Sequence, residues 1–276
     1  MEVPFRADPA LESLAKQLRI ARPNSIDEFL EHRPDLADAG KTIIAILLLH
    51  AEQNSVQHLW GKATQGDWYR LLKARLVGAF DSLGQDQIRI VTFNYDRSLE
   101  HYLYESLRPY YQDTDEAEYQ RRIGRISFLH VYGSLGPLPW QSPQAETIPY
   151  GVDSLRRNQV IRARWNIKVL HEEGDGDAQR NFDVAKEWLR SAERILFLGF
   201  GFLQANVERL GLGEVLQPHQ DIRATCKGLE RTSREAVEFC TEWAHRQNDS
   251  SGKVAILFPH ADADCYEFLH DHAVLS

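Results

Sequence analysis

The chain has 276 residues, 43% of them hydrophobic, which is enough for one large α/β domain with a substantial core. Its 40 acidic and 32 basic side chains give a net charge of −8, which argues against nucleic acid or an anionic membrane surface as a partner. Three scattered cysteines without a CxxC pair argue against a disulfide framework and against a cysteine-based zinc site.

The first part of the chain is predicted to be mainly helical. Helical patterns cover 25–31, 36–53 and 68–81, within a helical segment 25–83. The first residues lack the basic flank and the apolar stretch of a signal peptide, and the longest apolar run, 42–49, is too short to span a bilayer. We therefore expect a soluble, cytoplasmic protein without a membrane partner.

Short β-branched runs alternate with helical patterns in the rest of the chain. The predicted strands are 88–93, 126–131, 194–200, 222–225 and 254–258, and the predicted helices among them are 97–107, 181–192 and 232–247. Nearly continuous apolar strands separated by helices predict a Rossmann-like, doubly wound, mainly parallel sheet with helices on both faces. We treat 1–276 as a single domain whose α/β core is 84–276.

The first candidate site follows the strand predicted at 88–93. Asn94 and Asp96 appear where the apolar run stops. At the carboxyl end of a strand an asparagine amide can bond ribose hydroxyls or orient a water, and Asp96 can accept from an amide or a hydroxyl. The alternative is structural, with Asp96 as the N-cap of the next helix and Asn94 as a turn residue.

The second candidate site lies at the end of the strand predicted at 126–131. A neutral imidazole can take a proton from a ribose hydroxyl or a water near pH 7, so His130 is a candidate general base. Gly133 lets the backbone approach a ligand closely. The alternative is a structural histidine with satisfied hydrogen bonds, since histidine is often partly buried.

The proline-rich stretch 133–151 follows this strand and is predicted to be a loop. It contains Trp140 and starts where open α/β sheets bind ligands, so it is a candidate lid; an exposed connector is the alternative.

A third candidate follows the strand predicted at 194–200. Gly199 and Gly201 form a GxG before a helical segment that contains Asn206, an arrangement in which backbone amides can receive phosphate. Position 204 is glutamine and not glycine, so the full dinucleotide-binding pattern is incomplete. A tight packing turn explains the same residues equally well.

The order of these motifs resembles a known family. Thr-Phe-Asn-Tyr-Asp at 92–96, Leu-His-Val-Tyr-Gly-Ser at 129–134 and Phe-Leu-Gly-Phe-Gly-Phe at 197–202 are similar to the sirtuin-like domains of bacteria, in the branch linked to NAD depletion in anti-phage defence. The segments 25–30, 40–41 and 135–140 extend the resemblance over most of the chain.

The resemblance implies a role for each motif. Asn94 would position ribose and a water, Asp96 would lie near the nicotinamide amide, and His130 would be the base. The reaction implied is hydrolysis of NAD at the nicotinamide–ribose bond through an oxocarbenium-like state, with NAD as substrate and no metal. The residues expected to bind NAD are Thr92, Phe93, Tyr95, Gly133, Ser134, Gly199, Gly201, Phe202 and Asn206.

The chain departs from this family in two ways. The four cysteines of the deacylase branch's zinc module are missing, which favours NAD hydrolysis over protein deacylation. Family members also begin with a strand and a glycine-rich loop for the pyrophosphate, whereas no glycine precedes Gly40 here. Either the protein starts upstream of Met1, or it is a shortened homologue that binds NAD weakly or not at all.

The second departure leaves an alternative function, a module that binds NAD or ADP-ribose, or another protein, without turnover. The expected partners are NAD or a related adenine nucleotide, together with a second copy of the chain or a defence-system protein.

Overall fold

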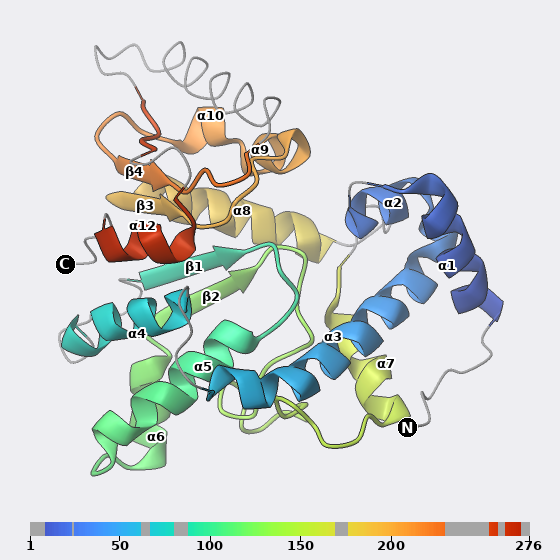
Figure 1. Ribbon diagram of the computed structural model, residues 1–276, viewed down its shortest axis with the longest axis horizontal. Coiled ribbons are helices and arrows are strands. Elements are labelled where there is room, and N and C mark those ends of the chain that lie inside the picture. Colours follow the sequence, from blue (N-terminus) through green and yellow to red (C-terminus); the bar gives the residue numbers. More distant parts are fainter. Residues whose placement is uncertain are drawn as a thin grey trace. The chain divides into compact units, whose positions relative to one another are not determined.

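The computed structural model (Figure 1) describes the ranges 9–23, 25–61, 67–79, 88–168, 176–229, 254–258 and 263–271. The chain is a mixed α/β protein that divides into two compact units. The first unit comprises Met1–Lys62 and Gly84–Asn181, and the second comprises Ala63–Leu83 and Phe182–Ser276.

The first unit contains one pair of strands and most of the helices. Its elements are α1 (Pro9–Ala21), α2 (Ile26–His32), the 3₁₀ helix η1 (Pro34–Leu36), α3 (Ala37–Leu59), β1 (Ile88–Thr92), α5 (Ser98–Leu107), the 3₁₀ helix η2 (Arg108–Tyr111), α6 (Glu116–Ile123), β2 (Ile126–His130) and α7 (Arg157–Asn166). Helix α8 (Gly176–Ser191) begins in the first unit and continues into the second.

The second unit contains the other pair of strands. Its remaining elements are α4 (Trp68–Ala79), β3 (Arg194–Phe197), α9 (Gln204–Leu210), α10 (Leu212–Val215), β4 (Asp221–Ala224) and α12 (Cys265–Asp271).

Strands β1 and β2 form a parallel pair, in a register that runs from Ile88 opposite Ile126 to Thr92 opposite His130 (Figure 1). Parallel neighbours need a crossover connection, and α5, η2 and α6 provide it. The crossover is held by side chains that are almost fully buried, namely Leu103, Leu107, Tyr119 and Ile123. Burial of each such side chain stabilises the fold by roughly 1.5–3 kcal/mol.

A close helix contact organises the N-terminal part of the first unit. Ser25 caps α2, because its hydroxyl accepts from the Glu28 amide at 3.1 Å. The buried Leu30 of α2 then packs on Gly40 of α3, where an added Cβ would lie 2.4 Å from a Leu30 methyl carbon. Gly40 therefore lets the two helices approach each other.

The second unit repeats the same principle with β3 and β4. These strands are parallel, and α9 and α10 connect them. Gly211 ends α9 in the left-handed conformation, with φ 57°, which a residue with a side chain adopts at a cost. The inward residues Ile195, Phe197, Ile222 and Ala224 are buried.

The predicted mixed α/β fold with parallel strands is confirmed, while several boundaries differ. The strand predicted at 194–200 ends at Phe197, because the Gly199 amide donates to the Thr225 hydroxyl and φ of Gly199 is 61°. Among the residues that the structure describes, the segment predicted as a strand at 254–258 forms one parallel bridge, between Leu257 and Arg223. The helix predicted at 232–247 lies outside the described residues.

Helices α1, α6 and α7 were not predicted from the sequence. Among the described residues, none of the helices combines the length and the apolar character needed to cross a membrane.

Candidate functional site

The carboxyl ends of β1 and β2 are neighbours. Thr92 pairs with His130, and the Val131 amide donates to the Thr92 carbonyl at 3.0 Å. Because the strands are parallel, the chain leaves both of them at the same edge. The first two sequence motifs therefore meet there.

Both ring nitrogens of His130 have partners. Nδ1 lies 2.6 Å from the carbonyl oxygen of Asn94, and because a carbonyl only accepts, Nδ1 carries a hydrogen and donates it. Nε2 lies 2.6 Å from Oε1 of Glu100 on α5. One proton lies between these two side chains, so they form either an imidazolium–carboxylate pair or an imidazole–carboxylic acid pair.

This pair is almost buried, with the side chains of His130 and Glu100 exposed by 11% and 5%. Burial lowers the pKa of His130, but the hydrogen bond and the negative charge of Glu100 raise it, helped by the Asn94 carbonyl and by Asp96. The net result is a pKa above the ordinary value of 6.5. These contacts therefore shift His130 toward its protonated, imidazolium form.

Asp96 fixes the start of the helix that carries Glu100. Its Oδ1 accepts from the amide of Ser98 at 3.1 Å and also from the Ser98 hydroxyl. Asp96 lies one residue before the N-cap Arg97 and satisfies one of the amides that the first helical turn leaves without an intrahelical partner. Asp96 thus has a structural task here, and it also adds negative charge near His130.

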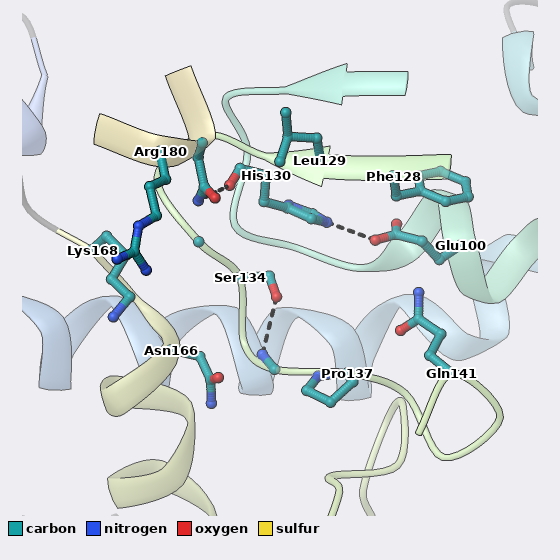
Figure 2. A pocket seen from close by; sticks show the side chains of 13 residues that line it. Glu100, Phe128, Leu129, His130, Ser134, Pro137, Gln141, Asn166, Lys168 and Arg180 are labelled. Atoms are coloured by element: carbon teal, nitrogen blue, oxygen red, sulfur yellow. Dashed lines mark hydrogen bonds and ion pairs between the residues drawn. The ribbon is translucent and has the colours of Figure 1, made fainter. Parts of the chain in front are cut away.

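A pocket of about 530 Å³ opens beside the His130–Glu100 pair (Figure 2). This volume lies within the range of small-molecule sites, roughly 300–1,000 Å³. Its walls come from α5, β2, the turn after β2, the end of α7 and the start of α8. The lining residues are Glu100, Phe128, Leu129, His130, Gly133, Ser134, Gly136, Pro137, Gln141, Asn166, Lys168, Arg180 and Asn181.

Asn181 on α8 holds the end of β2 in place. Its amide nitrogen donates to the carbonyls of His130 and Val131, at 3.1 and 3.4 Å. The backbone that carries the His130 ring is therefore fixed on one side by Asn181 and on the other by the β1–β2 pairing.

The turn after β2 requires glycine. Gly133 has φ 74°, and a Cβ there would lie 2.0 Å from the carbonyl oxygen of Asn166. The close approach arises because Gly133 bridges Ile167 and the Lys168 amide donates to the Tyr132 carbonyl at 2.8 Å. This glycine therefore brings the end of α7 against the pocket.

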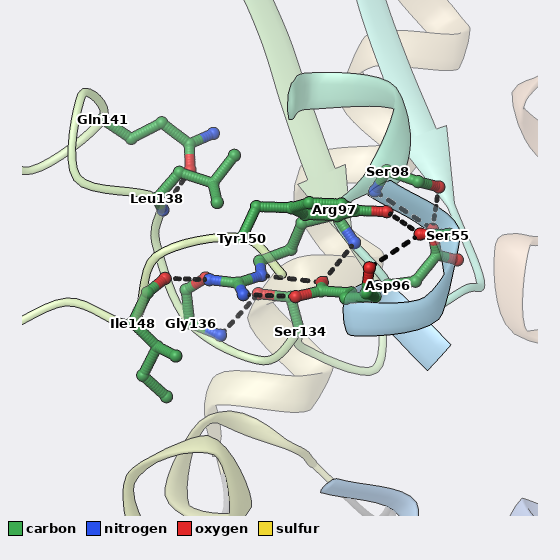
Figure 3. Close-up of polar contacts among 11 residues, drawn as sticks. Ser55, Asp96, Arg97, Ser98, Ser134, Gly136, Leu138, Gln141, Ile148 and Tyr150 are labelled. Atoms are coloured by element: carbon green, nitrogen blue, oxygen red, sulfur yellow. Dashed lines mark hydrogen bonds and ion pairs between the residues drawn. The ribbon is translucent and has the colours of Figure 1, made fainter. Parts of the chain in front are cut away.

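A buried ion pair anchors the proline-rich loop 133–151 (Figure 3). Arg97 bonds both carboxylate oxygens of Glu52 on α3, at 3.1 Å from Nε and 2.6 Å from the second guanidinium nitrogen. Its remaining terminal nitrogen donates to the carbonyls of Gly136 and Ile148, at 3.2 and 2.8 Å. Burial raises the pKa of Glu52, and the Arg97 contacts oppose that shift without cancelling it.

Apolar packing holds the same loop. Leu135, Leu138 and Ile148 are buried, and Trp140 stacks on Tyr104 with ring centroids 4.8 Å apart. These contacts favour a packed connector over a lid. The loop is a fixed wall of the pocket, which it lines through Ser134, Gly136, Pro137 and Gln141.

The remaining residues of the first motif lie beside the pocket but do not line it. Asn94 is exposed, and its backbone amide donates to the Thr92 hydroxyl at 3.1 Å. The Phe93 ring meets Tyr132 edge-on with centroids 5.7 Å apart, and Tyr95 is buried. Of the first two motifs, Leu129, His130, Gly133 and Ser134 reach the pocket directly, and Asn94 contributes its carbonyl to His130.

The third motif belongs to the second unit. Phe202 is fully buried with φ 48°, and its ring packs against Phe197, Phe200 and Phe258. Gly199 turns the chain after β3, whereas a Cβ on Gly201 would meet nothing within 4 Å. The burial of Phe202 favours a packing turn. Asn206 lies on α9 and is partly exposed.

Four residues that shape the site were not expected from the sequence: Glu52, Arg97, Glu100 and Asn181. Two of them carry a signal in the chain. Glu52 lies beyond the apolar run 42–49 but at helical spacing from Ala45 and Leu49, and Glu100 follows Asp96 by one helical turn.

Among the described residues, no group of three or more His, Cys, Asp or Glu side chains could hold a metal ion. Comparison of the chain with models of protein families, with curated proteins and with solved structures finds no match.

Proposed function

We propose that this protein is a sirtuin-like, NAD-consuming enzyme that hydrolyses NAD to nicotinamide and ADP-ribose. The observation that carries the proposal is the His130–Glu100 pair in the wall of a pocket at the carboxyl ends of two parallel strands. Open α/β sheets bind nucleotides at such strand ends. The order of the sequence motifs adds the specific link to NAD.

The pair supplies two properties that this reaction needs. Cleavage of the nicotinamide–ribose bond develops positive charge on the ribose, and the Glu100 carboxylate stabilises positive charge nearby. Loss of the shared proton to solvent, with Glu100 turned away from the ring, would leave Nε2 of His130 able to accept a proton from water or from a ribose hydroxyl and would keep Glu100 a carboxylate. The Asn94 carbonyl holds the His130 ring through Nδ1, and Asn181 holds the backbone that carries it.

The test is release of free nicotinamide from NAD by the purified chain and by a version extended upstream. We expect turnover that His130→Ala abolishes, while the exposed His58→Ala on α3 serves as the matched control with unchanged rate. Absence of nicotinamide release from both versions of the chain would refute the proposal.

A second candidate is a module that binds NAD or ADP-ribose without turnover. It is favoured by the engagement of both His130 nitrogens, which leaves neither available to a substrate in this conformation. Calorimetric titration with NAD distinguishes the two functions, because saturable binding with no nicotinamide released supports the module.

We also propose that the fold is a Rossmann-like, doubly wound sheet. Each unit contributes the element from which such sheets are built, a parallel strand pair with a helical crossover. An experimental structure that shows the full strand order tests this assignment.

A further inference from the structure

The pocket beside His130 is charged differently at its two ends. Figure 2 shows Glu100 and the ring of His130 at one end, and Lys168 and Arg180 at the other. Among the described residues that line the pocket, Glu100 supplies the one carboxylate, and the cations Lys168 and Arg180 lie away from it. The protein as a whole has a net charge of −8, so this basic end stands against the general balance.

Local structure places both cations at this end. Lys168 follows α7, and its amide donates to the Tyr132 carbonyl, which fixes the point from which its side chain extends. Arg180 lies near the N-terminal end of α8, where amide groups without helical partners give the helix a partial positive charge. Asn166 and Asn181 line the same region with neutral polar side chains.

We infer that the Lys168–Arg180 end of the pocket binds the phosphate groups of a dinucleotide, and that the Glu100–His130 end receives its cationic nicotinamide riboside. The inference rests on the proposed function and deepens it. A lysine and an arginine together suit a diphosphate, because arginine donates two parallel hydrogen bonds and lysine adds a compact charge. Glu100 would repel phosphate and attract the positively charged nicotinamide ring, so the charges set the direction in which the substrate lies.

This assignment defines the class of ligand. A nucleotide that carries a diphosphate, such as NAD or ADP-ribose, should bind, whereas nicotinamide riboside without phosphate should bind much more weakly. Inorganic pyrophosphate is the simplest probe, because it contains only the group that Lys168 and Arg180 would contact.

The test is calorimetric titration of the full chain with inorganic pyrophosphate at fixed ionic strength. Lys168→Gln and Arg180→Gln should each weaken binding about tenfold, the size expected for loss of one charged hydrogen bond. Arg19→Gln, which removes the same charge from an exposed position on α1, should bind like the unchanged protein. Equal affinities in all four proteins, or no binding by the unchanged protein, overturn the inference.

A parallel assay separates this inference from the proposed function. His130→Ala should lose NAD hydrolysis and keep pyrophosphate binding. Weaker pyrophosphate binding in Lys168→Gln and Arg180→Gln but not in Arg19→Gln supports the phosphate site, whether or not NAD is hydrolysed. If that pattern is found and no NAD is hydrolysed, the proposed hydrolase activity is overturned and the phosphate site stands. NAD hydrolysis with pyrophosphate affinities that do not distinguish the variants overturns the phosphate site alone.

Discussion

The first unit contains two buried ion pairs, Arg97–Glu52 and His130–Glu100, that lie in different surroundings. Arg97 and Glu52 are exposed by 1% and 2%, and the guanidinium also donates to the carbonyls of Gly136 and Ile148. These side-chain hydrogen bonds of Arg97 join α3 to the loop 133–151. His130 and Glu100 are nearly as buried, but both line a pocket, and the proton between them can move.

The difference shows how to distinguish a structural charge from a functional one. The contacts of Arg97 hold the loop 133–151 to α3, so its role is to hold the fold. His130 shares a proton with Glu100 and lines a pocket that a ligand can enter, so we propose a chemical role for it. Burial alone does not separate the two pairs.

The largest expected effect comes from breaking the structural pair. Arg97→Met should lower the free energy of unfolding by about 3–5 kcal/mol, because it leaves the Glu52 carboxylate buried without its partner. Denaturant unfolding at pH 7 measures this loss. The double variant Glu52→Leu with Arg97→Met should recover much of it, since no buried charge remains. A single variant as stable as the parent would show that Arg97 does not hold the loop.

The second expected effect concerns the pair in the pocket. Glu100→Gln removes the group that raises the pKa of His130, so burial should bring that pKa below 6.5. Loss of the charged hydrogen bond should destabilise the fold by roughly 1.5–3 kcal/mol near pH 6. NMR titration of the histidine signals measures the pKa of His130, and denaturant unfolding at several pH values measures the free energy of unfolding.

The sign of this pH dependence is fixed by the direction of the shift. Because the folded pKa of His130 is raised, its contribution to stability is complete below about pH 6.5 and is lost as the pH rises through the folded pKa. The stability difference between the parent and Glu100→Gln should therefore shrink with rising pH. A difference that grows with pH contradicts the assignment of His130 as an imidazolium.

The smallest expected effect is at His101, a histidine packed outside the pocket. Its ring stacks on Tyr150 with centroids 4.2 Å apart, and burial, helped by the charge of Arg97, lowers its pKa to about 4. The unfolded chain takes up this proton below about pH 6.5 while the folded chain does not, so stability falls between pH 6.5 and about 4. His101→Phe should keep the stacking and reduce this acid sensitivity. Equal acid sensitivity in both proteins would place the effect elsewhere.

Local patterns predicted the part of the site that depends on local sequence. The apolar runs 88–93 and 126–131 predicted two strands and their separation by helices predicted a parallel pair, and both are confirmed with each strand one residue shorter. From this it follows that His130 and Asn94 meet at one sheet edge. The alternative that Asp96 is the N-cap of the next helix was wrong by one residue, because Arg97 is the N-cap and Asp96 accepts from the Ser98 amide just after it.

The contacts between distant segments could not be predicted from these patterns. Arg97 and Glu52 are 45 residues apart, and no periodicity links one to the other. In the sequence, Glu100 is an acidic residue on a predicted helix with nothing to link it to His130. The two meet because the crossover packs beside β2. Phe202 reads as part of a glycine-rich phosphate turn, yet the structure buries it among aromatic rings.

The missed helices have a physical reason as well. Helix α7 is polar on most of its surface, so its apolar face, with Val160 and Ala163 buried, is too narrow to give a strong pattern. Helix α6 is short, although Asp115 with its bond to the Glu118 amide is a capping signal that the sequence does contain.

The most direct test of the central claim is to follow the histidine ring signals by NMR while NAD is added. His130 lines the pocket and His101 does not, so the Cε1–Hε1 signal of His130 should shift saturably while that of His101 stays in place. Loss of the shifting signal in His130→Gln assigns it. An unchanged His130 signal at saturating NAD would contradict the claim that this pocket is the NAD site.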